Sequence, residues 1–191
     1  MDTLLVLMAA PFVVPFVICF AILIALDGGS PFYSQMRVGK DGKRFRMWKL
    51  RSMVMNADQE LEAYLEANPV ARLEWDTSQK LKNDPRITRI GRFIRKTSID
   101  ELPQLFNVVR GDMSLVGPRP MMVDQESIYP GVNYKHLRPG ITGNWQISDR
   151  NECTFRDRAL FDDAYHRDLS FLTDVSILAR TIGVVLRGTG Y

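Results

Sequence analysis

The stretch Ser98-Ile99-Asp100-Glu101-Leu102-Pro103-Gln104-Leu105-Phe106-Asn107-Val108 bears most directly on the fold and chemistry of this 191-residue chain. It places two adjacent carboxylates, Asp100 and Glu101, at an expected helix start. The basic pair Arg95-Lys96 precedes them, and a segment with a proline-flanked arginine, Gly111 to Pro120, follows. Carboxylates set among arginines are typical of a site that handles a charged phosphate beside a reactive acid. The pattern therefore indicates phosphoryl-group chemistry.

A structural role for the same carboxylates is the alternative. Ser98 and Glu101 fit the S-x-x-E capping box, in which both side chains satisfy backbone donors at a helix start, and acidic residues in a first turn complement the helix dipole. The two roles are compatible. Pro103 is tolerated only near such a first turn. The apolar residues around it recur at helical spacing and are expected to bury one helix face: Leu102, Leu105, Phe106 and Val109.

An uncharged apolar segment occupies residues 4–26. At about 1.5 Å per residue, a straight helix of this length would cross the hydrocarbon layer of about 30 Å. Pro11 and Pro15 each delete a backbone hydrogen bond and clash with the preceding turn, which weakens a spanning helix without excluding it. A cleavable signal peptide is disfavoured, because no Lys or Arg precedes Leu4 and the apolar run is longer than usual for such peptides.

A basic block follows the apolar segment, with seven Lys or Arg between Arg37 and Arg51 against a single acid, Asp41. The positive-inside rule places this flank in the cytoplasm, and each cation near an anionic leaflet adds about 1 kcal/mol of attraction. A nucleic-acid interface is the alternative for a basic run. No nucleic-acid-binding motif accompanies the block, so we expect no nucleic-acid partner.

The basic block also predicts a β-hairpin. Phe45 to Met53 alternates apolar and basic residues, a period of two that is typical of a strand with one charged face. Gln35 to Gly39 reads as a strand entering a glycine-containing turn at Lys40 to Lys43. The two strands are therefore expected to pair across that turn.

Two longer helices are expected further along the chain. Ala57 to Ala67 is acidic, with Leu61 and Leu65 on one side. Thr173 to Leu186 carries apolar residues on one face, a pattern that fits a core helix and a helix in the membrane interface equally well. Together these elements predict an α+β, mostly helical fold with a small β-hairpin and an N-terminal membrane helix.

Cysteine and histidine give no support for a metal or disulfide site. Cys19 lies in the apolar segment and Cys153 in a distant polar one, so a disulfide is not expected and a reducing compartment fits. Neither His136 nor His166 has a second ligand at the spacing that a zinc site requires.

Three motifs in order resemble a known family. These motifs are similar to those of the bacterial monotopic phosphoglycosyl transferases. They are the stretch at 98–108, then Gly111 to Pro120, then Arg138 to Gly143 with Trp145-Gln146 and Arg150-Asn151. This is the bacterial sugar transferase family, which starts exopolysaccharide and glycoconjugate synthesis. The similarity runs from the apolar N-terminus to about Leu186, in family order.

The resemblance implies transfer of a sugar 1-phosphate from a UDP-sugar to undecaprenyl phosphate, with release of UMP. In the family the Asp of the pair, here Asp100, attacks the phosphorus next to the sugar and becomes a covalent aspartyl phosphate, which splits one difficult displacement into two easier ones. Glu101 would help hold Mg²⁺ or manage protons. Mg²⁺ is expected at Asp100 and Glu101, because it favours one or two carboxylates plus phosphate oxygens.

Basic residues in the family motifs are expected to bind the phosphates. Arg95, Arg119 and Arg150 fall in these motifs, and a guanidinium group suits bidentate phosphate contacts. A surface ion pair of little worth is the alternative for any one arginine. For Arg119 the rigid sequence Gly117-Pro118-Arg119-Pro120 favours an aimed side chain. Lys49 is a further candidate near the phosphates, with contact to lipid headgroups an equal alternative.

The resemblance also implies a place in the membrane. In the family a proline breaks the apolar segment so that both ends emerge on the cytoplasmic face, and Pro11 matches that position, although Ala10 stands where Ser is common. We therefore expect residues 1–29 to form a re-entrant membrane helix hairpin. Residues 30–191 are expected to form a single cytoplasmic catalytic domain with interfacial amphipathic helices, on the cytoplasmic face of the bacterial inner membrane.

Several questions stay open at this point. UDP-galactose or UDP-glucose is favoured as the donor, with acetamido sugars as close alternatives. Asn144 and Asp149 depart from the family pattern and add to that uncertainty. The oligomeric state, a homodimer included, is open, and so is whether the N-terminus has been trimmed. The alternative function is a membrane-tethered scaffold without enzymatic activity, in which Asp100 and Glu101 only cap a helix.

Overall fold

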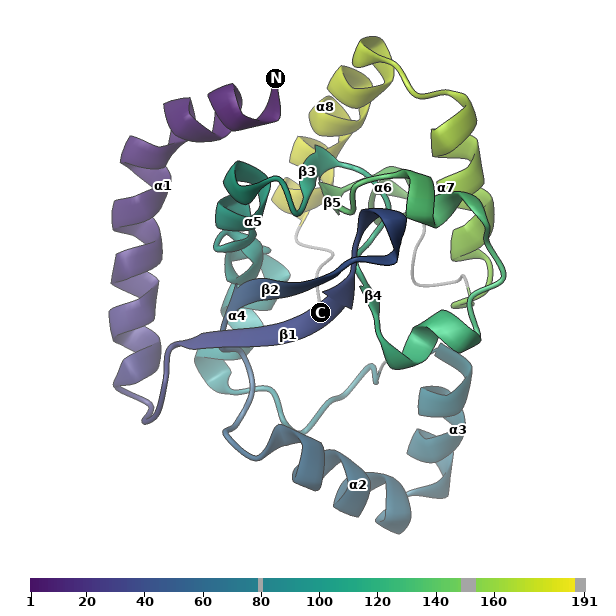
Figure 1. Ribbon diagram of the computed structural model, residues 1–191. Coiled ribbons are helices and arrows are strands. Elements are labelled where there is room, and N and C mark those ends of the chain that lie inside the picture. The colour runs from purple at the N-terminus through teal and green to yellow at the C-terminus, as the bar shows by residue number, and fades with distance from the viewer. Residues whose placement is uncertain (79–80, 149–153, 188–191) are drawn as a thin grey trace.

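A computed structural model of the chain describes residues 1–78, 81–148 and 154–187. The fold is mostly helical with two small sheets, in agreement with the α+β prediction (Figure 1). The helices are α1 (Asp2–Ala25), α2 (Ala57–Ala67), α3 (Pro69–Ser78), α4 (Arg89–Lys96), α5 (Gln104–Arg110), α6 (Asn144–Ile147), α7 (Arg158–Arg167) and α8 (Phe171–Arg187). The strands are β1 (Phe32–Val38), β2 (Arg44–Leu50), β3 (Ser114–Val116), β4 (Met121–Met122) and β5 (Gly140–Thr142). Short 3₁₀ turns are η1 (Lys40–Gly42), η2 (Ile99–Glu101), η3 (Asp124–Ser127) and η4 (Asn133–His136).

The predicted β-hairpin is confirmed. Strands β1 and β2 pair antiparallel from Phe32 opposite Leu50 to Val38 opposite Arg44, and η1 connects them. The short strand β4 pairs with the other edge of β1. A separate parallel pair joins β3 to β5 and thereby brings together the segments that follow Gly111 and Arg138.

Helix α1 contacts the rest of the fold at both of its ends. Near the start, the Asp2 carboxylate accepts a hydrogen bond from the Ser114 hydroxyl at 2.5 Å. Near the other end, the Arg51 guanidinium donates to the Ile24 carbonyl at 3.0 Å. Figure 1 shows the first turns of α1 at an angle to its remaining length. Pro11 and Pro15 lie inside the helix, and a bend is typical of internal prolines.

By length and composition, α1 is the one helix among the described residues that could cross a membrane. Most of its large apolar side chains are exposed, and Phe12 is 81% exposed. An exposed apolar surface of this extent marks a contact with lipid or with another apolar surface.

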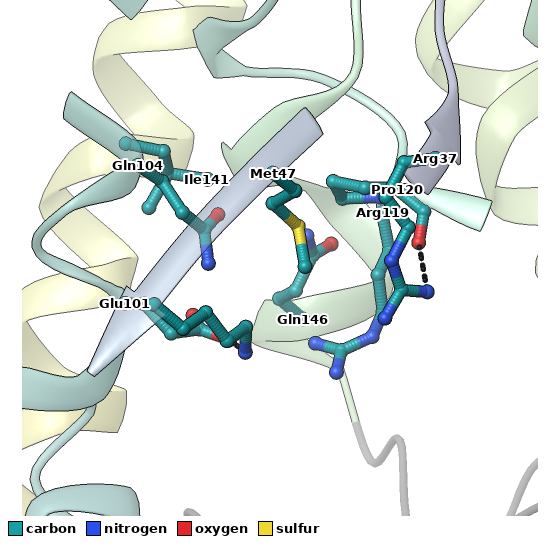
Figure 2. Close-up of a pocket in the computed structure, with 9 residues that line it drawn as sticks. Arg37, Met47, Glu101, Gln104, Arg119, Pro120, Ile141 and Gln146 are labelled. Carbon is teal, nitrogen blue, oxygen red and sulfur yellow. Dashed lines mark hydrogen bonds and ion pairs between the residues drawn. The ribbon is translucent and has the colours of Figure 1, made fainter. Parts of the chain in front are cut away.

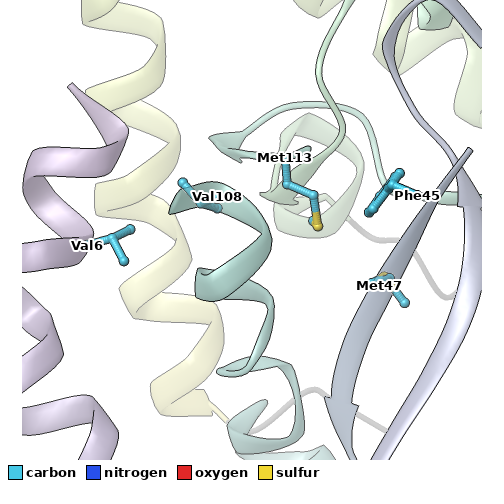
Figure 3. Close-up of a cluster of buried hydrophobic side chains, with 5 residues drawn as sticks. All are labelled: Val6, Phe45, Met47, Val108 and Met113. Atoms are coloured by element: carbon cyan, nitrogen blue, oxygen red, sulfur yellow. The ribbon is translucent and has the colours of Figure 1, made fainter. Parts of the chain in front are cut away.

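A buried apolar cluster joins α1, the hairpin and α5 (Figure 3). Val6 of α1 and Val108 of α5 pack with Phe45 and Met47 of β2 and with Met113. The cluster fixes α5 between the apolar helix and the hairpin, and so sets the position of the 3₁₀ turn η2 that precedes α5.

The buried face of α5 agrees only in part with the one predicted: Leu105 packs against this cluster, but other members of the predicted face do not. Phe106 is 55% exposed and Val109 is also exposed, whereas Gln104 and Asn107 point into the fold. Asn107 takes the inward place because its amide donates to the Arg46 carbonyl at 2.8 Å and accepts from the Trp48 N–H at 3.2 Å. A polar side chain that is fully hydrogen-bonded to a strand can displace apolar ones from the inner face.

The other helix predictions have mixed outcomes. Helix α2 is confirmed, with Leu61 and Leu65 buried. Helix α3 was not predicted; it begins at Pro69, and proline is favoured in the first turn of a helix. Helix α8 is confirmed, but it packs on the core through Ile177, and its predicted apolar face is largely exposed. Of the predicted face, Leu178 packs against the core, whereas Val175, Ile182 and Val185 are exposed, so both alternatives hold in part.

Candidate active site

The carboxylate pair lies on the 3₁₀ turn η2, directly after α4. Ser98 adopts a left-handed conformation (φ 57°, ψ 18°) and makes no side-chain capping hydrogen bond. The predicted capping box is therefore wrong: the chain passes from α4 into η2 at Ser98, and α5 begins only at Gln104, after Pro103. A left-handed non-glycine residue costs about 1–3 kcal/mol, and such residues cluster at functional sites.

Lys49 at the end of β2 binds both carboxylates. Its Nζ lies 2.7 Å from Glu101 Oε1 and 3.6 Å from Asp100 Oδ2. Asp100 is only 5% exposed. By these distances the close contact of Lys49 is with Glu101. Asp100 has the Lys49 charge nearby but makes no short hydrogen bond to Lys49. This geometry makes Lys49 part of the carboxylate site.

Burial dominates the electrostatics of Asp100. Loss of solvation raises the pKa of its carboxyl group, Lys49 lowers it, Glu101 raises it, and Arg95 and Arg119 lower it further. Arg95 is itself half-buried, and this loss of solvation lowers the pKa of its guanidinium, while Asp100 and Asp84 oppose that shift. Asp100 is thus a buried acid whose ionised form depends on Lys49 and the two arginines.

A small pocket of about 20 Å³ opens beside this pair. Figure 2 shows Glu101 and Gln104 facing Arg37 and Arg119 across it, with Gln146 between them. Such an arrangement presents the Glu101 carboxylate to one side of a bound group and guanidinium groups to the other, with the buried Asp100 directly before Glu101 in the chain. It suits a phosphate, whose oxygens bind guanidinium groups while its phosphorus accepts a carboxylate nucleophile.

The loop that carries Arg119 is held rigidly. Its guanidinium lies over the ring of Trp145, 5.5 Å from the centroid. The Arg119 carbonyl accepts a hydrogen bond from Arg158 at 2.6 Å, and the Pro120 carbonyl accepts one from Arg37 at 3.3 Å. These contacts agree with the sequence-based expectation of an aimed arginine.

Close backbone packing explains the glycines of this loop. A Cβ atom on Gly117 would lie 2.3 Å from the Arg138 carbonyl oxygen, and one on Gly140 would lie 2.1 Å from the Gly117 nitrogen. Only glycine permits this approach of β3 to β5. The parallel pair in turn positions the start of the Arg119 loop.

Gln146 on α6 carries an unusual buried amide. The residue is 7% exposed, and neither Nε2 nor Oε1 has a hydrogen-bond partner in the part of the chain that the structure describes. An unsatisfied buried polar group costs about 1–3 kcal/mol. Because Gln146 lines the pocket, this amide is available to a bound ligand.

The structure brings together most of the predicted site residues. Lys49, Asp100 and Glu101 form one cluster, with Arg95 and Arg119 close enough to act on the Asp100 carboxyl. Arg150 lies outside the described residues. No cluster of three or more His, Cys, Asp or Glu side chains that could hold a metal occurs within the described ranges.

Comparison with known proteins identifies the family. A family model described as bacterial sugar transferase matches residues 1–188. The chain belongs to the bacterial sugar transferase family. It is 52% identical over 92% of its length to a UDP-galactose-lipid carrier transferase of Erwinia amylovora, and 51% identical over 87% to an undecaprenyl-phosphate galactose phosphotransferase of Salmonella typhimurium. It is 41% identical over 99% to the exopolysaccharide production protein ExoY of Sinorhizobium fredii.

These relatives differ in length from this bacterial sugar transferase. The chain spans 37% of the Erwinia protein and 36% of the Salmonella protein, but 85% of the Sinorhizobium protein. The family match over residues 1–188 confirms, at the level of the family, the resemblance drawn from the sequence motifs.

Three residues of the site in this sugar transferase were not singled out from the sequence. Arg37 was counted only in the basic block, and Gln104 and Gln146 were quoted only as parts of motifs. Each is a polar or charged residue with apolar neighbours on both sides. That local contrast could have marked Gln104 and Gln146, because a polar side chain flanked by apolar ones is often buried, and a buried polar group needs a hydrogen-bond partner.

Proposed function

We propose that this protein transfers a sugar 1-phosphate from a UDP-sugar to undecaprenyl phosphate, through a covalent intermediate on Asp100 and with release of UMP. The observation that carries the proposal is the buried Asp100 carboxylate beside Lys49, next to a pocket lined by Arg119. The activities named for the Erwinia and Salmonella relatives support it. We propose the first membrane step of exopolysaccharide or glycoconjugate synthesis as its role.

The proposed reaction has two displacements at one phosphorus. First, an Asp100 oxygen bonds to the phosphorus attached to the sugar, and the bond from that phosphorus to the bridging oxygen breaks, so that UMP leaves. Second, a phosphate oxygen of undecaprenyl phosphate bonds to the same phosphorus, and Asp100 leaves as a carboxylate. Lys49 and Arg119 stabilise the negative charge that accumulates in both steps.

The burial of Asp100 suits a nucleophile. A carboxyl group with a raised pKa is more basic than an exposed one, and its oxygen attacks more readily once it is ionised. Lys49 lies close enough to favour ionisation but makes its short contact with Glu101. The ionised form of Asp100 is therefore favoured by a nearby cation that makes no short hydrogen bond to the attacking oxygen.

Mg²⁺ is part of the proposal. Asp100 and Glu101 would supply two adjacent carboxylates, of which Glu101 lines the pocket, and Mg²⁺ uses such a pair when substrate phosphates and waters complete its shell. When bound there, the ion would neutralise charge on the phosphate groups as UMP leaves.

We propose that α1 is re-entrant and holds the site at the cytoplasmic face of the inner membrane. Contacts of both ends of α1 with the same domain, through Asp2 and Ile24, support this arrangement, because a spanning helix separates its ends by the thickness of the bilayer. The bend in α1 and the basic block after it support the same placement.

Replacing Pro11 and Pro15 together by Leu is expected to straighten α1 towards a true span, because the missing backbone hydrogen bonds are restored. The test is labelling of a cysteine in an N-terminal tag by a membrane-impermeant maleimide in whole cells, in a Cys19→Ser background. The wild-type tag is expected to be protected and that of the double variant partly labelled. Labelling of the wild-type tag from outside would contradict the re-entrant arrangement.

Arg119→Lys is expected to lower kcat/KM by about tenfold or more. Lysine keeps the charge but loses the planar fork, and one hydrogen bond to a charged group is worth about 1.5 kcal/mol or more. The control is Arg110→Lys, at an exposed position of α5 away from the pocket. Rates for Arg119→Lys near those of the wild type would mean that Arg119 has only a structural role.

The donor and the activity are tested together. Detergent-solubilised protein is incubated with undecaprenyl phosphate, Mg²⁺ and, one at a time, UDP-galactose, UDP-glucose and UDP-N-acetylgalactosamine, and UMP release is measured. We propose UDP-galactose as the best donor, on the names of the Erwinia and Salmonella relatives. Absence of UMP with every donor would favour the alternative of a non-enzymatic scaffold.

A further inference from the structure

A second pocket adjoins the carboxylate site and is much larger. It has a volume of about 220 Å³ and lies between the start of α5 and the C-terminal half of α8. Three residues line both pockets, namely Glu101, Ile141 and Gln146. The two cavities are therefore neighbours that share one wall, with polar groups on that wall.

The surface of the larger pocket is mostly apolar, although Thr97, Ser98, Thr142 and Thr181 also line it. Leu102 and Leu105 form one side, and Val184 and Val185 of α8 form the other. Its polar side chains include two threonines whose hydroxyl groups are already used. Thr142 Oγ1 and Thr181 Oγ1 lie 2.7 Å apart, and the Thr181 hydroxyl also donates to the Ile177 carbonyl at 2.7 Å. A uridine or a sugar would find few partners here, because burying their polar groups requires hydrogen bonds.

We propose that this pocket seats the isoprene units next to the phosphate of the polyprenyl acceptor. The identity of the acceptor rests on the function proposed above; the position and chemistry of the pocket do not. A lipid phosphate placed beside Asp100 must extend its chain away from the charged site, and the shared wall at Glu101 and Gln146 leads into an apolar cavity. An apolar chain is the occupant that such walls stabilise.

Size and surroundings agree with an isoprenoid. A cavity of about 150 Å³ accommodates a benzene ring, so this pocket has room for one isoprene unit and part of the next. Beyond the pocket, Ile182 and Leu186 of α8 expose large apolar side chains. An apolar chain that leaves the pocket can therefore continue along these side chains.

Gln146 lies at the junction between the smaller pocket, where the lipid phosphate would bind, and the larger pocket, where the isoprene units would bind. Its amide is the buried polar group without a partner described above, and it lines both pockets. A phosphate oxygen at the junction would accept a hydrogen bond from Nε2 and so satisfy a donor that otherwise costs stability. The proposal thus assigns the orphaned amide to the phosphate end of the lipid acceptor.

A matched pair of valines on α8 tests the proposal. Val185 lines the pocket and Val175 does not, and their exposures are similar, 39% and 44%. Val185→Trp is expected to raise the KM for undecaprenyl phosphate about tenfold or more, because filling a cavity with excess volume forces the chain out. Val175→Trp is expected to leave that KM unchanged. The first half-reaction, followed as exchange of labelled UMP into the UDP-sugar without acceptor, reports whether each variant is folded and competent.

The outcomes separate the two proposals. If the wild type neither exchanges UMP nor releases it, the proposed function fails. If the wild type is active and the two Trp variants have the same KM for the acceptor, the pocket proposal is wrong and the function stands. A Val185→Trp protein that loses UMP exchange as well is examined by the milder labelling experiment below.

Cysteine protection provides that second measurement. Val185→Cys and Val175→Cys are made in a background with Cys19 and Cys153 replaced by Ser, and their reaction with a maleimide is timed. Farnesyl phosphate is expected to slow labelling at Val185→Cys several-fold and to leave Val175→Cys unchanged, whereas UMP is expected to slow neither. Equal protection at both positions, or none at either, would overturn the proposal.

Discussion

Asp100→Asn is expected to abolish sugar phosphate transfer, with a loss of at least about a thousandfold, as is typical when a covalent nucleophile is removed. Asparagine keeps the shape of the side chain but lacks the anion that attacks phosphorus. Asp100 is buried, and the loss of solvation that raises its pKa is an energetic cost of keeping the carboxylate charged. The variant is therefore expected to be as stable as the wild type or more so.

The stability of this variant has a defined dependence on pH. A carboxyl group whose pKa is raised by folding contributes stability at low pH, and this contribution is lost as the pH rises through the folded-state value. Asparagine does not titrate. The melting temperature of Asp100→Asn should therefore rise relative to that of the wild type as the pH is raised from about 4 to about 8. Turnover above a few per cent of the wild type would overturn the nucleophile assignment, and a variant that melts far lower would make the loss uninformative for chemistry.

Lys49→Met is expected to reduce kcat/KM at neutral pH by about 10²–10³-fold, the usual cost of removing one preorganised group that stabilises developing charge. Methionine keeps much of the side-chain length but leaves Asp100 and Glu101 adjacent without their common cation. Because Lys49 lowers the pKa of Asp100, its removal should raise that pKa further and protonate the nucleophile over a wider range.

The pH profile distinguishes this role from a structural one. The acidic limb of the kcat/KM profile should move to higher pH in Lys49→Met, so that part of the lost activity returns as the pH is raised. Lys43→Met, at an exposed position in the same hairpin, is the matched control and should keep the wild-type profile. A uniform loss at every pH would contradict an action of Lys49 on the ionisation of Asp100.

Local patterns in the sequence predicted the local structure well. The period of two in Phe45 to Met53 and the glycine turn before it correctly gave the hairpin β1–β2, and the bounds of α2 are those expected. Such signals succeed because neighbouring residues alone determine the strand or helix periodicity. The motifs around Asp100 likewise led to the cluster of Lys49, Asp100 and Glu101.

The errors occurred where distant contacts override local preference. Ser98 and Glu101 have the spacing of a capping box, but Ser98 turns left-handed and Glu101 binds Lys49, which is 52 residues away in the sequence. Phe106 was assigned to the core on periodicity, and the hydrogen bonds of Asn107 to β2 rotate a different face inward. Neither Lys49, the partner of Glu101, nor strand β2, the partner of Asn107, could be identified from the residues near them in the sequence.

The same reason explains the missed parts of the site. The pairing of β3 with β5 joins segments separated by the loop that carries Arg119, and it brings Gln146 beside Glu101. Nothing in the sequence near Gln146 indicates that its amide lacks a partner, because that depends on packing from several elements. Sequence motifs thus located Lys49, Asp100 and Glu101, which the fold brings together, while the walls of the two pockets required the fold.

Mass spectrometry of the intact intermediate tests the central proposal most directly. Wild-type protein is incubated with UDP-galactose and Mg²⁺ in the absence of a lipid acceptor, quenched in acid and digested. We expect a peptide containing Asp100 that is heavier by one hexose phosphate, formed together with UMP and lost when undecaprenyl phosphate is added before the quench. UMP release that requires the lipid acceptor, with no such adduct on Asp100, would contradict it.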